Sequence, residues 1–94
     1  MENQFGVWLK VNCNISDSAI GKYKRAIRAV SKDMIEEAVL QGDLYSISSW
    51  EKYESVKAKI LANDFFIDKD TKGHRMYSCA MNLYSSFLKD LRIE

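Results

Sequence analysis

Apolar residues recur at intervals of three and four along most of this 94-residue chain, and the chain contains no proline. This spacing gathers apolar side chains on one face of an α-helix, whereas a proline inside a helix would break it. A chain of this length holds one hydrophobic core. We therefore predict an all-α fold in a single helical domain over residues 1–94: a compact bundle of four to five short helices packed around a long C-terminal helix.

The first half of the chain predicts two or three of these helices. A short helix carries Phe5, Trp8 and Leu9, and segment 11–15 interrupts it. Residues 16–18 (Ser-Asp-Ser) offer N-cap side chains for a second helix, whose apolar residues are Ile20, Tyr23, Ile27 and Val30. A third stretch, from about residue 32 to 40, follows the second helix or continues it after a bend. Gly42 is suited to the left-handed residue that ends it.

The second half predicts a connector and two further helices. Segment 44–47 is expected to be extended, and Ser48 and Glu51 form a capping box that opens a helix ending near Asn63. Segment 64–73 is expected to be a loop. The last helix spans roughly 74–91 with two adjoining apolar stripes, one of Met76, Ala80, Leu83, Phe87 and Leu91 and one of Tyr77, Met81, Tyr84 and Leu88. So wide an apolar surface predicts the central helix of the bundle.

Composition narrows the class of protein. With 47% hydrophobic residues and a formal net charge of +1, the chain is neither disordered nor basic over its whole surface. Two cysteines are too few for a disulfide scaffold, so Cys13 and Cys79 are expected as free thiols, with Cys79 buried in an apolar stripe. No leader and no run of about 18 apolar residues is present, which predicts a cytoplasmic protein outside the membrane.

The near-neutral net charge conceals an uneven distribution. Segment 16–32 has five cations and one anion, whereas segment 33–56 has six anions and one cation. On a helix, four of the cations fall within about 120° of arc, opposite the apolar face; they are Lys22, Arg25, Arg28 and Lys32. Such a face predicts contacts with the phosphates of a nucleic acid. The alternative is a solvated face whose cations interact with acidic residues of a neighbouring helix.

A second group of cations precedes the last helix. Lys69 belongs to this group, and Lys72, His74 and Arg75 stand where the expected loop meets the start of that helix. Cations at a helix N-terminus are unfavourable for the helix dipole, which favours a functional role for these three residues as a second nucleic-acid contact. The alternative is that they are ordinary loop residues.

No motif in the chain predicts catalysis, a metal site or a cofactor. Segment 68–73 imitates the start of a calcium loop, but Lys72 occupies a ligand position and Cys79 replaces the bidentate glutamate. One histidine and two distant cysteines cannot supply four zinc ligands, and nothing near His74 in sequence completes a set of a nucleophile and a histidine base. We therefore expect no catalytic residue, no metal and no cofactor.

Three segments of the chain together resemble a known family. They are residues 5–12 (FGVWLKVN), residues 18–27 (SAIGKYKRAI) with Val30 and Ser31, and residues 72–84 (KGHRMYSCAMNLY) with Phe87 and Leu88. In this order they resemble the small N-terminal helical domain of bacterial restriction proteins, including HNH-type nucleases and subunits of methylation-dependent systems. The last segment is also similar, more weakly, to the core-binding helical domain of tyrosine recombinases, which clamps DNA.

The resemblance implies a targeting module whose catalysis lies in a C-terminal nuclease region outside this chain. Together with the basic face, it predicts a non-enzymatic module of a restriction-type protein that contacts DNA phosphates. The alternative function is a protein-interaction or oligomerisation domain that pairs the acidic stretch 33–54 with the basic helix.

Overall fold

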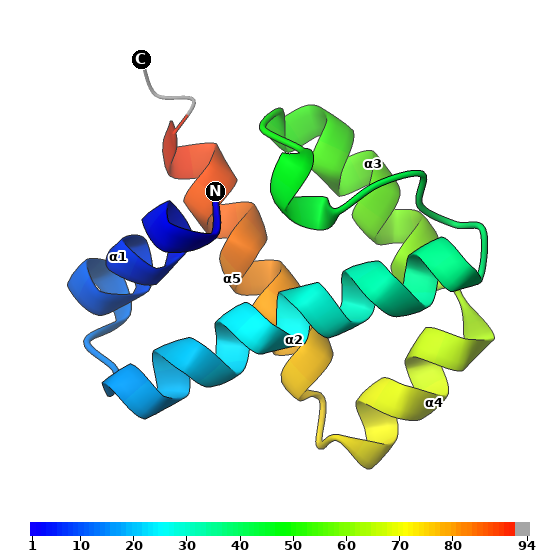
Figure 1. Ribbon diagram of the computed structural model, residues 1–94, viewed down its shortest axis with the longest axis horizontal. Coiled ribbons are helices and arrows are strands. Elements are labelled where there is room, and N and C mark those ends of the chain that lie inside the picture. The colour runs from blue at the N-terminus through cyan, green and yellow to red at the C-terminus, as the bar shows by residue number, and fades with distance from the viewer. Residues whose placement is uncertain (92–94) are drawn as a thin grey trace.

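The computed structural model describes residues 1–91, which form five α-helices and one short 3-10 helix, with no strand in that range (Figure 1). The elements are α1 (Glu2–Cys13), α2 (Asp17–Glu36), η1 (Leu44–Ser46), α3 (Trp50–Leu61), α4 (Asp64–Lys72) and α5 (Met76–Leu91). The predicted all-α bundle is confirmed. None of the helices described is long and apolar enough to cross a membrane.

Helix α5 occupies the centre of the bundle, as its two apolar stripes predict. It packs against each of the other four α-helices. Helix α2, the longest at 20 residues, crosses α5, with α1 on one side of the crossing and α3 and α4 on the other (Figure 1). The described residues measure 33 × 28 × 16 Å, so the bundle is flat. A flat bundle leaves one long side of α2 open to solvent.

Aromatic rings fill the middle of the core. Tyr84 of α5 is fully buried, and its ring lies 5.2 Å from that of Phe5, 5.4 Å from Tyr45 and 5.1 Å from Tyr53. These contacts have the edge-to-face geometry that aromatic pairs favour. The Tyr53 hydroxyl donates to the Met81 carbonyl at 2.8 Å. The cluster thus joins α1, η1 and α3 to the central helix.

The boundaries in the first half differ from those predicted. Helix α1 continues to Cys13, where Asn14 takes the left-handed conformation at φ 49°. Helix α2 runs unbroken to Glu36, so the separate third helix expected over 32–40 is wrong. The left-handed residue after α2 is Ala38, at φ 61°, whereas Gly42 has a negative φ. After α2 the chain turns so that the Val39 and Leu40 amides both donate to the Met34 carbonyl. This turn places Leu40 in the core.

The second half also contains corrections. Segment 44–46 is a 3-10 helix, and the N-cap of α3 is Ser49, whose Oγ accepts from the Lys52 amide at 3.3 Å, instead of Ser48. The expected loop over 64–73 is largely the helix α4. The Asn63 side chain caps it by accepting from the Phe66 amide at 3.0 Å, and the Phe66 ring is buried. As a result α5 begins at Met76, and His74 lies in the turn before it.

Candidate nucleic-acid interface

The four predicted cations of the second helix lie on one continuous helical face. Ser16 opens α2 by accepting from the Ala19 amide at 3.2 Å, and the helix continues past the last of these cations. The buried residues of α2 are on the other side; they are Ala26, Ile27, Val30, Ser31 and Met34. Lys22, Arg25, Arg28 and Lys32 are all exposed. Because α2 has no bend at residue 32, Lys32 keeps its place on this face.

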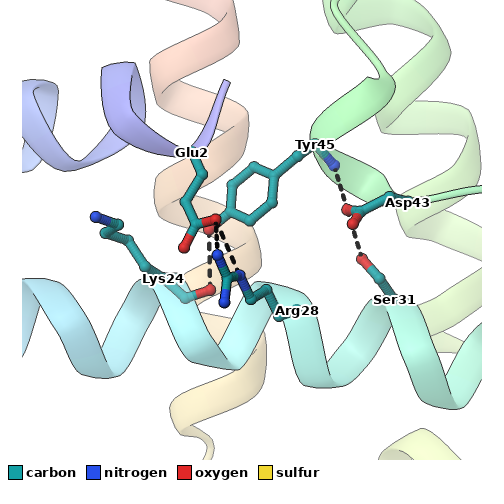
Figure 2. A network of polar contacts seen from close by, with 6 residues as sticks. All are labelled: Glu2, Lys24, Arg28, Ser31, Asp43 and Tyr45. Atoms are coloured by element: carbon teal, nitrogen blue, oxygen red, sulfur yellow. Dashed lines mark hydrogen bonds and ion pairs between the residues drawn. The ribbon is translucent and has the colours of Figure 1, made fainter.

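Arg28 differs from the other three cations because it has an acidic partner. Its Nε donates to Glu2 Oε1 of α1 at 2.9 Å, an ion pair that joins the two helices (Figure 2). For Arg28 the structure thus agrees with the alternative prediction, in which a cation of this face interacts with an acidic residue of a neighbouring helix. Lys22, Arg25 and Lys32 form no ion pair within residues 1–91. Their charges are therefore open to an external anion, whereas that of Arg28 is shared with Glu2.

Two further contacts hold the segment after α2 against this helix (Figure 2). The Tyr45 hydroxyl donates to the Lys24 carbonyl at 2.9 Å, and burial, followed by the charge of Glu2, raises the pKa of Tyr45. The phenol therefore stays protonated and remains a donor. Asp43 Oδ1 accepts from the Tyr45 amide at 2.8 Å and from the Ser31 hydroxyl at 3.3 Å. The Asp43 carboxylate therefore has hydrogen-bond partners within the chain.

Other anions of the acidic stretch 33–54 also find partners within the molecule. Asp33 pairs with Lys69 of α4, and Glu54 pairs with Lys57 at 3.1 Å. These contacts lower the negative charge that the stretch presents to another molecule. The pairing of acidic and basic surfaces between two copies remains a prediction.

The second cation group is divided by the end of α4. Lys72 is the last residue of that helix, where a cation suits the dipole, and it pairs with Asp68 at 3.0 Å. The dipole argument applied to Lys72 is therefore wrong, since it assumed the start of a helix. His74 and Arg75 lie in the turn between α4 and α5, both exposed and both left-handed, at φ 56° and 64°.

The two cation groups meet at a hollow of about 480 Å³ between α2 and the α4–α5 turn. Its lining residues come from both elements and from the first turn of α5; they are Lys22, Tyr23, Gly73, His74, Arg75, Met76 and Cys79. The structure thus brings three predicted site residues together, Lys22, His74 and Arg75. Arg25, Arg28, Lys32 and Lys72 lie outside the hollow.

Four residues that line the hollow lie outside the sequence-based set: Tyr23, Gly73, Met76 and Cys79. Two of these, Tyr23 and Cys79, have the helical spacing of core residues. The helical apolar spacing of Tyr23 predicts a core residue, but Tyr23 is only half-buried. The prediction that Cys79 is buried is wrong, because this residue lines the hollow and is exposed. Its Sγ lies 3.9 Å from the Tyr23 hydroxyl oxygen. No sequence signal distinguishes these positions from core positions.

Comparisons of this chain with protein-family models, with curated proteins and with solved structures give no match. Within residues 1–91, no group of three or more His, Cys, Asp or Glu side chains is placed to hold a metal ion. Cys13 and Cys79 are free. The candidate site is therefore defined by its cations.

Proposed function

We propose that this chain is a non-catalytic DNA-binding module of a restriction-type DNA-processing protein that acts in the cytoplasm. In this proposal catalysis belongs to a nuclease region outside the chain. The observation that carries the proposal is the exposed basic face of α2, on which Lys22, Arg25 and Lys32 lack acidic partners within residues 1–91. Arg75, close to Lys22 at the hollow, extends that face toward the α4–α5 turn.

The length of the basic face suits a DNA backbone. Lys22 and Lys32 are ten residues apart in α2, which corresponds to about 15 Å along the helix axis. Duplex DNA carries one negative charge per about 1.7 Å of its axis, so several phosphates come within reach of such a face. Contacts of this kind position a protein on DNA without reading its sequence.

The decisive experiment is a titration of a short fluorescent duplex with the whole chain, followed by anisotropy at several salt concentrations. The proposed interface contains four permanent cations that have no acidic partner within residues 1–91; they are Lys22, Arg25, Lys32 and Arg75. If all four contact phosphates, the slope of log affinity against log salt is about −3.6. Affinity then falls roughly a hundredfold between about 50 and 200 mM salt. Absence of binding at about 50 mM salt, or binding that ignores salt, refutes the proposal.

Two arginines of α2 provide a matched pair of variants. Arg25→Ala removes an open charge, and we expect the salt slope to become shallower by about 0.9. Arg28→Ala removes a charge shared with Glu2 and frees that carboxylate, so the slope changes less while stability falls by about 0.2–1 kcal/mol. Equal effects of the two variants on the slope contradict the assignment of the open cations.

A second candidate function, self-association, is favoured by a different surface. Val7 and Val11 of α1 are 65% and 74% exposed, and with Phe87 and Leu91 of α5 they line an uncharged hollow of about 460 Å³. Two copies can meet there without repulsion between like charges. A dimer held by this uncharged hollow persists at high salt, whereas a dimer held by acidic and basic surfaces weakens. Light scattering at low and high salt measures the difference, and a monomer at both removes this candidate.

A further inference from the structure

We propose that the hollow between α2 and the α4–α5 turn binds a phosphate group of the DNA backbone, held by Lys22, His74 and Arg75. This inference rests on the proposed function and specifies where a phosphate is anchored. It adds to the open face of α2 a concave site built from two elements that are about fifty residues apart in sequence.

The charges around the hollow favour an anion. An arginine can hold a phosphate with two parallel hydrogen bonds, and a lysine adds a point charge from the facing helix. No carboxylate lines the hollow within residues 1–91, and two carboxylates of α4 have partners of their own: Asp70 Oδ1 accepts from the Ser78 amide at 2.9 Å, and Asp68 pairs with Lys72. The cations of Lys22 and Arg75 have no such partner within residues 1–91.

The backbone of the turn gives a second line of support. Left-handed residues are ordinarily Gly or Asn, yet here the two that adopt this conformation are His74 and Arg75. Gly73 does not take it: its φ is −90°, and a Cβ there would come within 2.8 Å of the Tyr77 ring. The glycine thus serves the close packing of the turn on α5. Backbone strain concentrates at ligand-binding positions, and here it falls on two of the residues that line the hollow.

Tyr23 adds an uncharged hydrogen-bond donor to the lining of the hollow. The contact of its hydroxyl with Cys79 Sγ, and then partial burial, raise the pKa of Tyr23, so the phenol keeps its proton. A protonated hydroxyl can donate to a phosphate oxygen. Cys79 lines the hollow and is exposed, which makes its thiol a reporter of whether the hollow is filled.

The test measures alkylation of the native chain by iodoacetamide, with the rates at Cys79 and Cys13 resolved by mass spectrometry. Cys13 does not line the hollow and serves as the internal reference. The probes are inorganic phosphate, with sodium chloride as a control at equal ionic strength, and a short duplex without terminal phosphates. We expect phosphate at about 50 mM and the duplex each to slow Cys79 alkylation at least threefold relative to Cys13, while chloride has no such effect.

Variants separate a specific site from general attraction. Arg75→Gln removes the bidentate donor, and the phosphate concentration that half-protects Cys79 is expected to rise about tenfold. Lys59→Gln removes one exposed cation of α3 outside the hollow and is expected to leave this value unchanged. Equal behaviour of the two variants overturns the inference.

The two proposals fail in different ways. If the duplex binds with the expected salt dependence but leaves Cys79 alkylation unchanged, the hollow is not a phosphate anchor and the basic face of α2 alone accounts for binding. If phosphate protects Cys79 while the duplex neither binds nor protects, the hollow takes a free phosphate and the DNA-binding proposal is wrong. Protection by neither probe overturns the inference directly.

Discussion

Ala38 occupies a position at which glycine is the residue of lower energy. It follows the C-cap of α2 with φ 61°, and two hydrogen bonds close the turn, from Val39 to the Met34 carbonyl at 2.9 Å and from Ala38 to the Ile35 carbonyl at 3.1 Å. These are the two bonds of a Schellman motif, whose left-handed residue is most often glycine. Ala38 is exposed, so its methyl group contributes little to packing.

The Ala38→Gly substitution should therefore stabilise the fold. A left-handed conformation costs a residue with a Cβ roughly 1–2 kcal/mol, and glycine removes that cost. Glycine also increases the entropy of the unfolded chain, which offsets about 0.4–1 kcal/mol of this gain in stability. The expected net gain is about 0.5–1 kcal/mol, or an increase in Tm of roughly 2–8 °C for a domain of this size.

Urea unfolding followed by circular dichroism measures this gain, with Ala62→Gly as the matched control. Ala62 is the C-cap of α3, is exposed, and has φ −93°. Its replacement carries the entropy cost without relief of strain, so we expect a loss of about 0.5–1 kcal/mol. If both variants lose stability equally, the left-handed geometry at Ala38 does not govern the end of α2 and the reasoning is refuted.

Two further predictions concern close packing and acid. Gly73→Ala should lower stability by about 1 kcal/mol or more, because the new Cβ meets the Tyr77 ring at 2.8 Å. In Gly42→Ala the new Cβ makes only an ordinary contact with Ser46 Oγ at 3.8 Å, so this variant should gain about 0.4–1 kcal/mol. Urea midpoints compare the two. Partial burial disfavours the Glu54 carboxylate, but hydrogen bonds from Ser85 and from a neighbouring lysine outweigh it and lower the pKa of Glu54. This group therefore stabilises the fold above the pKa of the unfolded chain, and that contribution is lost as pH falls through the folded value. Thermal unfolding between about pH 6 and 3 should show a smaller acid-dependent loss in Glu54→Gln, and an unchanged pH dependence contradicts the assignment.

Helix content could be predicted from local pattern, but several helix ends could not. The spacing of apolar residues identified the buried faces of α2 and α5, since residues three or four apart share one face of any helix. The same local reasoning assigned a loop to 64–73, because the apolar residues of that segment stand only at its start. In the structure only Phe66 among them is buried. The helix there depends on the Asn63 cap and on the Asp33–Lys69 ion pair with α2.

The candidate site, too, could be predicted only in part from the sequence. Periodicity alone placed Lys22, Arg25, Arg28 and Lys32 on the exposed side of α2, and all four are exposed. It could not identify Arg28 as the one that pairs with Glu2, because that contact joins residues 26 positions apart. Which charge is open and which is shared depends on how closely α1 approaches α2.

The sequence by itself determined the all-α class, the core stripes of α5 and the basic face of α2, because each follows from side-chain order along one helix. Only the tertiary structure decided that Lys22 meets His74 and Arg75 at one hollow, and that Cys79 lies open beside them. The physical reason is that contacts between distant segments depend on the angle at which helices cross. That angle is set by the packing of whole side-chain surfaces, such as the aromatic cluster around Tyr84, which no single helix encodes.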